Sequence, residues 1–327
     1  MNLKNFNNIY KEINKLSLFI KNKIKKISNK NKNYYYSKKS DMSDALLFNL
    51  LKTQNNSTQS SISTFLSINN KKKITRQGIV KRANNISVNI LNELYNDLIN
   101  KFNYNTNNNL IYNIIDGTTI NIYNNNHTYK TINLLGILSN NINSNIYKND
   151  LINSSEISLF YHYINNNYFD KNNLFILDRL YFSNKLANTF YEKNIKFLCR
   201  IKSNSHLLNK FNQKYNIDNK ITELSYDEMI NDNKIKVIIF KTKNDFIYLT
   251  TNLLDDKYDI EFYKETYKKR WLIEINFKIL KANTNLNNIK TKKEEKINIE
   301  LKSINITSFL YNYILKLLNM IKIKIKK

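Results

Sequence analysis

One stretch of the sequence, residues 263–283, most constrains how this chain can fold. It contains no glycine or proline, and apolar residues recur along it at three- and four-residue spacing. Such spacing predicts an amphipathic helix that buries one face against another element. At about 100° per residue, four residues fall on one narrow stripe of that helix: Tyr267, Arg270, Glu274 and Lys281.

The residues of this stripe leave two interpretations open. A lone carboxylate among cations suits a divalent-cation site, with Glu274 on the metal and with Arg270 and Lys281 on neighbouring phosphate oxygens. The ordinary alternative is a solvated helix face that carries a few weak ion pairs. Acidic residues elsewhere in the chain decide between them.

The charge of the chain predicts a polyanionic partner. There are 52 Lys and Arg residues against 26 Asp and Glu residues, so the formal net charge is +26. This excess opposes compaction unless a polyanion neutralises it, and nucleic acid is the expected partner. An anionic membrane is the rival, but no run approaches the roughly 18 apolar residues of a membrane helix. The single Cys199 fits a reducing compartment and excludes a zinc site built from several cysteines.

The first part of the chain, residues 1–105, predicts a series of helices. Apolar residues at helical spacing mark one helix before a basic run over 21–32, which binds phosphate, directs nuclear import or is simply a solvated tail. Further helices are expected over 43–52, 57–66, 75–83 and 87–102. The helix with Gln77, Lys81 and Arg82 favours a helix-turn-helix-like DNA-binding region, although many helical domains share this pattern.

From residue 110 the pattern becomes strand-like. The expected elements are strands over 110–116, 118–124 and 128–139, a helix over 155–165, a strand over 174–178, a helix over 183–193 and a strand over 195–202. This order predicts an α/β fold with a mixed sheet flanked by helices. Two more strand-like runs, 235–242 and 246–253, predict a β-rich insertion over 205–256.

Two aspartates follow apolar strand-like runs. Asp116 and Asp178 each stand where a strand is expected to end, which is a common place for ligands in sheet proteins. The more ordinary role of such an aspartate is to cap a turn or helix. Together with Glu274 they would form an all-oxygen ligand set, which suits Mg²⁺ or Mn²⁺ rather than zinc. Two such ions would support phosphodiester chemistry on DNA.

These residues and their spacing resemble the DDE transposases of bacterial insertion sequences. Tyr267, Arg270, Glu274 and Lys281 match all four positions of the Y-x2-R-x3-E-x6-K signature of the insertion sequence four group. The blocks IIDGTTI at 114–120 and LDRLYFSNKLANTFYEKNIKFLCRIK at 177–202 resemble the blocks around the two aspartates of that family. The similarity covers roughly residues 43–285.

The resemblance implies an RNase H-like catalytic core, two Mg²⁺ or Mn²⁺ ions, double-stranded DNA as partner and a homodimer that holds both element ends. No membrane and no small-molecule cofactor are implied. Asp116, Asp178 and Glu274 would be the catalytic metal ligands. DNA contacts are expected from Tyr267, Arg270, Lys281, Lys278, Arg200, Lys202 and Arg179.

The implied organisation has a helical DNA-binding region over 1–105, an RNase H-like core over 106–204 and 257–295 interrupted by the β-rich insertion over 205–256, and a basic C-terminal helix over 296–327. Cytoplasm and nucleoid are the expected location in a bacterium, and the nucleus or a viral factory in a eukaryote or large DNA virus. The family has glycine where Leu180 and Asn194 stand; if these positions need positive φ, Asn tolerates it better than Leu.

The expected activity is cut-and-paste transposition, in which the element ends are cut and joined to target DNA. A structure-specific nuclease of the same fold would cut without joining. A catalytically inactive DNA-binding derivative would do neither.

Overall fold

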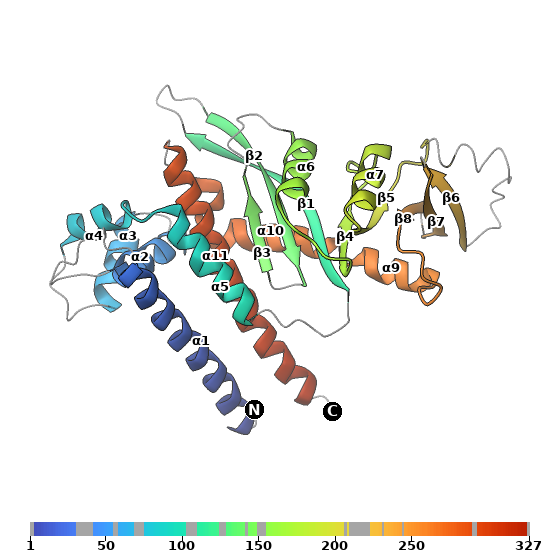
Figure 1. Cartoon of the computed structure of the whole chain (residues 1–327). Helices are drawn as coiled ribbons and strands as arrows, with labels where there is room; N and C mark the ends of the chain where they lie inside the picture. The colour runs from blue at the N-terminus through green and yellow to red at the C-terminus, as the bar shows by residue number, and fades with distance from the viewer. Residues whose placement is uncertain are drawn as a thin grey trace.

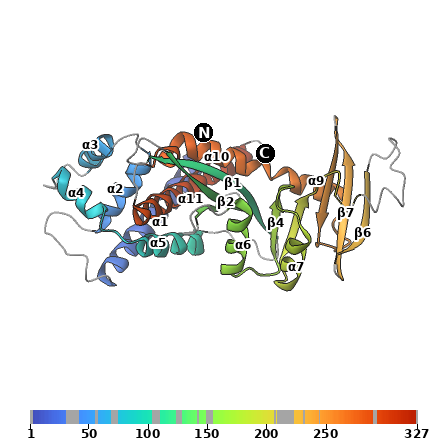
Figure 2. The ribbon, with the colours of Figure 1, turned by 90° about the horizontal axis from the view of Figure 1, so that it is seen from above.

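We analysed a computed structural model of the chain, which describes residues 3–30, 42–54, 58–68, 75–102, 110–123, 129–140, 143–148, 155–205, 208, 223–230, 232–243, 245–289 and 293–325. A helical bundle occupies one end of an elongated molecule, and a twisted sheet runs from it to the other end (Figures 1 and 2). The long first and last helices lie in the same bundle, and the chain termini lie near its lower edge in Figure 1.

The sheet is mixed. Its order is β3-β2-β1-β4-β5-β8-β7-β6 among the described residues. The strands are β1 (Ile111–Tyr123), β2 (Tyr129–Ser139), β3 (Asn143–Tyr147), β4 (Asn173–Leu177), β5 (Lys196–Arg200), β6 (Glu223–Ile230), β7 (Asn233–Lys241) and β8 (Phe246–Thr251). Strands β1, β4 and β5 pair in parallel, and the other pairs are antiparallel. The predicted α/β class is confirmed.

Helices cover both faces of this sheet and form the bundle beside it. The helices are α1 (Leu3–Lys30), α2 (Met42–Gln54), α3 (Thr58–Ile68), α4 (Arg76–Ala83), α5 (Val88–Phe102), α6 (Glu156–Asn166), α7 (Asn184–Glu192), α9 (Ile260–Lys268), α10 (Trp271–Asn283), a 3₁₀ turn η1 (Asn285–Asn288) and α11 (Glu294–Ile325). Helices α6 and α7 cover one face, and α9 and α10 cover the other (Figure 1).

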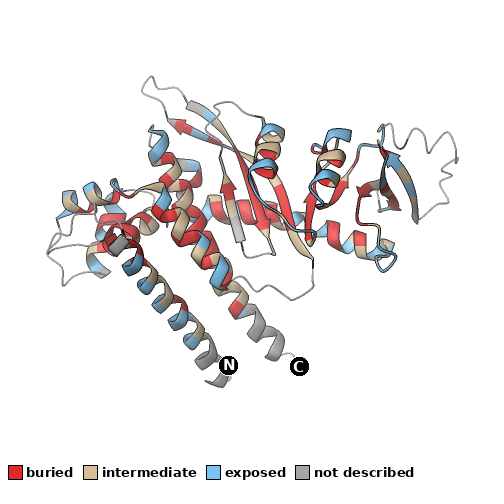
Figure 3. Cartoon of the chain, in the orientation of Figure 1, coloured by how far each residue is buried: buried red, intermediate tan, exposed pale blue. Residues whose placement is uncertain are grey.

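Successive residues of the central strands pack under the helices on opposite faces of the sheet. Ile115 and Leu177 are buried in the cluster beneath α6 and α7, while their neighbours Ile114 and Ile176 are buried beneath α9 and α10. Successive strand residues point to opposite faces, so a strand covered on both sides must be apolar throughout. All five residues of β4 are accordingly buried (Figure 3).

The strand end expected at Asp116 is wrong. Strand β1 continues through both residues to Tyr123, with Asp116 opposite Gly136 and Gly117 opposite Leu135 on β2. An Asp-Gly pair makes a hairpin turn when its backbone takes positive φ, and no described glycine does so. The cross-strand pairing of the long β1–β2 ribbon therefore overrides the local turn signal, and Asp116 lies inside a strand.

The single helix expected over 263–283 is also wrong. It is two helices, α9 and α10, separated at Lys269 and Arg270. Around the break the backbone bonds run to the third residue back, as in the 2.9 Å bond from the Arg270 N–H to the Tyr267 carbonyl. Such bonds tighten the helical turn. The break places Arg270 at the start of α10, one turn before Glu274.

The region before α9 is part of the central sheet. Strands β6 to β8 extend this sheet, because β8 pairs with β5. Strand β6 was not expected, and along it exposed residues alternate with partly buried or buried ones. The basic run that begins at Lys21 continues α1, and α11 packs with α1, α2 and α5 in one core. The N- and C-terminal helices thus share one bundle. Helices α2, α3 and α4 share a smaller core.

The two positions where family glycines are replaced behave differently. Asn194 has φ of 52°, whereas Leu180 has no positive φ. Asn194 follows α7, where its N–H donates to the Tyr191 carbonyl and the next N–H, of Ile195, donates to the Phe190 carbonyl. This is the bond pattern of a Schellman helix end, which needs a left-handed residue.

We expect Asn194→Ala to lower the free energy of unfolding by about 1 kcal/mol, because alanine keeps the Cβ that clashes in the left-handed region but lacks the short polar side chain that lets asparagine tolerate it. Asn194→Gly should change it by less than about 0.5 kcal/mol. Urea denaturation of the two variants beside the parent measures the difference. Equal effects of the two substitutions would contradict this account.

Candidate active site

Asp116 lies in the middle of β1, half-buried, at the place where β1 leaves its parallel partner. The β1–β4 pairing ends at Ile114 and Ile176. One carboxylate oxygen, Oδ1, accepts a 3.0 Å hydrogen bond from the Gly117 N–H. The side chain lies on the same face of β1 as Ile114, which is the face that α10 covers.

Asp178 is the residue that follows β4. It too lies two residues beyond the last β1–β4 pair, since Ile176 is the partner of Ile114. Its Oδ1 accepts a 2.7 Å bond from the Arg179 N–H, and its carbonyl accepts bonds from the Tyr181 N–H and the Cys199 thiol. The parallel register therefore brings the two aspartates to the same end of adjacent strands.

Glu274 reaches this region from α10, the helix on the opposite side of the site. The Arg270 Nη2 donates to its Oε1 at 2.7 Å. Both side chains are largely buried, with 17% of the Arg270 side chain and 29% of the Glu274 side chain exposed. Helix α10 is held against the sheet by Phe277, whose ring lies directly on the backbone of Gly136.

The charges of these side chains are coupled. The pKa of Asp116 is raised from 3.8 to about 6, first by burial and then by the negative charge of Glu156, with a smaller contribution from Glu274; Arg270 acts in the opposite direction. Burial alone would lower the pKa of Arg270, but its interactions with Tyr267, Glu274 and Asp178 hold this pKa above the ordinary value. Arg270 is thus coupled to all three predicted catalytic acids.

No three His, Cys, Asp or Glu side chains within the described residues are arranged to hold a metal ion. The predicted three-acid metal centre is therefore not assembled in this structure. Glu274 is paired with Arg270 in this structure. The donor set itself fits Mg²⁺ or Mn²⁺, since every candidate ligand is a carboxylate oxygen.

The model of one protein family matches this chain. It is the transposase DDE domain, and it matches residues 112–310, which is more than half of the chain. The chain belongs to the transposase DDE domain family. The match begins in β1 and ends in α11, so it includes Asp116, Asp178 and Glu274. Proteins of this family generally use divalent metal ions.

A sequence relative supports the insertion sequence four type of this DDE chain. A 109-residue segment is 32% identical to a Synechocystis sp. protein assigned as a transposase for insertion sequence element IS4SA. The match covers 29% of this chain and 32% of that protein, so the chain spans about a third of the length of this relative.

A solved structure supports the fold. The cryo-electron microscopy structure of a piggyBac transposase synaptic complex with hairpin DNA matches 90% of this DDE chain and 71% of that chain, with a TM-score of 0.50 and 13% sequence identity. This likeness confirms the RNase H-like architecture of the sheet and its helices.

Tyr267 of the signature is buried in the DDE domain. It is 8% exposed, and its hydroxyl has no hydrogen-bond partner among the described residues. Burial raises its pKa, and the charge of Asp178 adds to this, while Arg270 and Arg200 lower it. The ring packs in the core beneath α9 and α10. Tyr267 therefore lies beneath the site, behind the acids.

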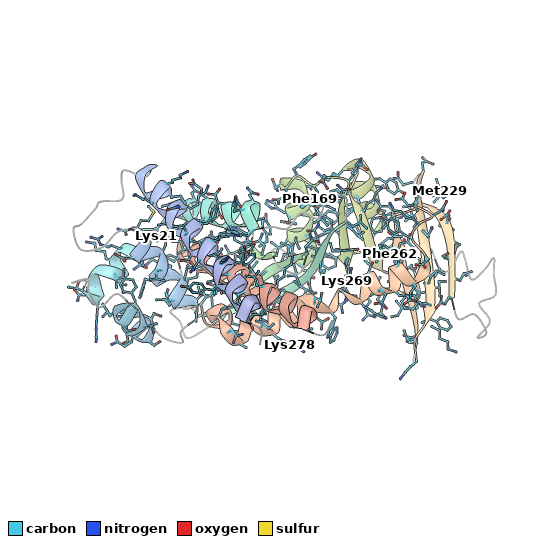
Figure 4. The ribbon with its side chains drawn as sticks, turned by 90° about the horizontal axis from the view of Figure 1, so that it is seen from below. Lys21, Phe169, Met229, Phe262, Lys269 and Lys278 are labelled. Atoms are coloured by element: carbon cyan, nitrogen blue, oxygen red, sulfur yellow. The ribbon has the colours of Figure 1, made fainter. Side chains whose placement is uncertain are left out.

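The cationic residues expected to contact DNA lie around the acids. Arg179 follows Asp178 directly and is exposed, and Arg200 ends β5, two residues before the exposed Lys202. Lys278 is exposed on α10, more than two turns beyond the α9–α10 junction at Lys269 (Figure 4), and Lys281 lies in the last turn of α10. No helix in the described part of the chain is long and apolar enough to cross a membrane.

Three residues of the site were missed by the sequence analysis: Glu156, Tyr181 and Gly136. Glu156 opens α6, and the Tyr181 hydroxyl donates a hydrogen bond to its Oε1. The scarcity of glycine was a usable signal for Gly136, because a glycine kept in a glycine-poor chain is more often required. The sequence offered no such signal for Glu156, since an acidic residue in the first turn of a helix is common.

We expect Asp116→Asn to raise the free energy of unfolding by about 1 kcal/mol at pH 8 without divalent cations. The folded-state pKa of Asp116 lies near 6, above its unfolded value of 3.8, so the cost of its ionisation to folding builds up as the pH rises from about 4 to about 6 and stays constant above that. The full shift of roughly 2 units would correspond to about 3 kcal/mol, and solvent screening of a half-exposed group reduces it.

Urea denaturation in the presence of EDTA at pH 8 and pH 5 measures this effect. The gain should shrink towards zero as the pH falls from 6 to 4. A gain that is the same at both pH values would contradict the electrostatic origin.

Proposed function

We propose that this chain is a transposase that cuts DNA at the ends of a mobile element and joins the freed 3′ ends to target DNA. Membership of the transposase DDE domain family supports the proposal. The observation that supports it is the position of the acids: Asp116 and Asp178 each lie two residues beyond the last β1–β4 pair, and α10, which carries Glu274, packs on the same face of the sheet.

In this proposal Asp116, Asp178 and Glu274 hold two Mg²⁺ or Mn²⁺ ions. Bound there, such ions supply the Lewis acidity that activates the attacking oxygen and stabilises the leaving oxygen of an in-line phosphodiester displacement. The surrounding sheet and helices half-bury the acids, which strengthens their charge interactions.

The cations hold the substrate. Arg270, with its planar guanidinium, suits two oxygens of one phosphate, and Lys278 and Lys281 extend the contact along α10. Arg179, Arg200 and Lys202 flank the other side. The net charge of +26 favours double-stranded DNA, and the α2–α4 unit, with the exposed Gln77 and Lys81 on α4, is the proposed second DNA contact. A homodimer would hold two element ends.

Incubating the purified chain with Mg²⁺ and duplexes taken from both flanks of its gene tests the proposal. Cut ends joined to a target plasmid are expected, and EDTA should abolish both products. Cutting without joining would identify a nuclease of the same fold. Binding without cutting would identify an inactive DNA-binding derivative.

A further inference from the structure

We infer that Glu156 and Tyr181 form a positioning pair that fixes the separation of Asp116 and Asp178. The inference rests on the proposed function, in which these two aspartates share divalent cations. Neither Glu156 nor Tyr181 belongs to the three-acid set, and they come from different segments, the start of α6 and the loop after β4.

The need for such a pair follows from the sheet. The β1–β4 ladder ends at Ile114 and Ile176, two residues before each aspartate. Backbone pairing of adjacent strands fixes their spacing only where the ladder continues. Beyond it, the distance between Asp116 and Asp178 depends on other contacts.

Tyr181 ties the Asp178 loop to α6. Its N–H donates to the Asp178 carbonyl at 3.1 Å, and its hydroxyl donates to Glu156 Oε1. The ring is 2% exposed and packs edge-on against Phe160 of α6, with 5.0 Å between ring centroids. This packing fixes the position of the phenol ring, and therefore the position of the hydroxyl that donates to Glu156.

Glu156 ties α6 to β1. A Cβ added to Gly117 would overlap the Glu156 carboxyl group, so this acid lies directly on the backbone of the residue that follows Asp116. The same Gly117 donates its N–H to Asp116 Oδ1 at 3.0 Å. An open pocket of about 330 Å³ lies beside this contact, lined by Gly117, Thr118, Thr119, Asn133, Leu134 and Glu156. The contacts run without a gap from Asp178 through Tyr181 and Glu156 to Asp116.

The direct test is Mn²⁺ binding, measured by the loss of the electron paramagnetic resonance signal of free Mn²⁺. Removing a hydrogen bond that orients metal ligands typically weakens metal affinity by 10- to 100-fold. We expect Tyr181→Phe and Glu156→Leu to weaken Mn²⁺ binding about tenfold. Glu156→Gln keeps an acceptor for the tyrosine hydroxyl, so it should restore binding to within about threefold of the parent.

Two matched substitutions serve as controls. Tyr161 packs against Phe160, as Tyr181 does, and Tyr161→Phe removes a hydroxyl that hydrogen-bonds the Ser183 hydroxyl instead of Glu156. Glu192→Gln removes an exposed acid at the end of α7. Both should bind Mn²⁺ as the parent does. Thermal unfolding of each variant separates a folding defect from a binding defect. If Glu156→Leu does not fold, the result for Tyr181→Phe, the smallest change, decides the test.

The outcomes separate this inference from the proposed function. If the parent binds no Mn²⁺, or Asp116→Asn binds it as tightly as the parent, the proposed function fails and this inference fails with it. If Asp116→Asn loses binding while Tyr181→Phe keeps it, only the positioning pair is overturned. Equal losses in Glu156→Gln and Glu156→Leu would also overturn it, because charge rather than the hydrogen bond would then matter.

Discussion

Cleavage of the element end should fall at least about a thousandfold in each of Asp116→Asn, Asp178→Asn and Glu274→Gln, while DNA affinity stays within about threefold. Each substitution keeps the shape of the side chain and removes the charge that binds the cation. A thousandfold loss corresponds to about 4 kcal/mol of transition-state stabilisation, which is in keeping with the loss of a metal that activates the nucleophile. Gel-based cleavage assays and fluorescence anisotropy measure the two quantities.

Affinity should persist because DNA binding draws on positive charge spread over the whole chain rather than on three acids. Asp256→Asn is the matched control, because Asp256 is exposed in the loop before α9. Its cleavage rate should equal that of the parent. Retention of cleavage by any one of the three variants would remove that residue from the proposed ligand set.

Gly136→Ala should lower the free energy of unfolding by about 1–3 kcal/mol and remove most of the cleavage activity. A Cβ on Gly136 would overlap the ring of Phe277, so α10 has to move away from the sheet, and overpacking of this kind costs about that much. Gly136 pairs with Asp116 across β1 and β2, and Phe277 lies one helical turn from Glu274. The same displacement therefore separates Glu274 from Asp116.

A control substitution at a second glycine and a compensating substitution at Phe277 test this prediction further. Gly78→Ala in α4 should change the free energy of unfolding by no more than about 1 kcal/mol, because a Cβ there lies 2.9 Å from Thr75 Oγ1, the cap of α4, and the weakened cap offsets the helix preference of alanine. Phe277→Leu should partly rescue Gly136→Ala in stability and in cleavage, since contacting residues give non-additive effects. Additive losses in the double variant would show that α10 does not rest on Gly136.

Several features of the fold could be predicted from local sequence. Ser155 and Ser183 cap α6 and α7, where their hydroxyls accept from the backbone N–H three residues on. The apolar run 174–177 was predicted as a central strand, and all five residues of β4 are buried. Local predictions failed where partners distant in sequence decide the outcome. Pairing with β2 carries β1 straight through Asp116-Gly117, and pairing with β7 adds β6 to the edge of the sheet.

Residue types and their spacing were enough to predict the proposed ligands Asp116, Asp178 and Glu274 and the cations expected near them. The tertiary structure decided how they are held. Parallel pairing of β1 with β4 aligns the two aspartates, Gly136 admits the helix of Glu274, and Tyr181 reaches Glu156 across two segments. These are contacts between residues far apart in the chain, and local propensity carries no information about them.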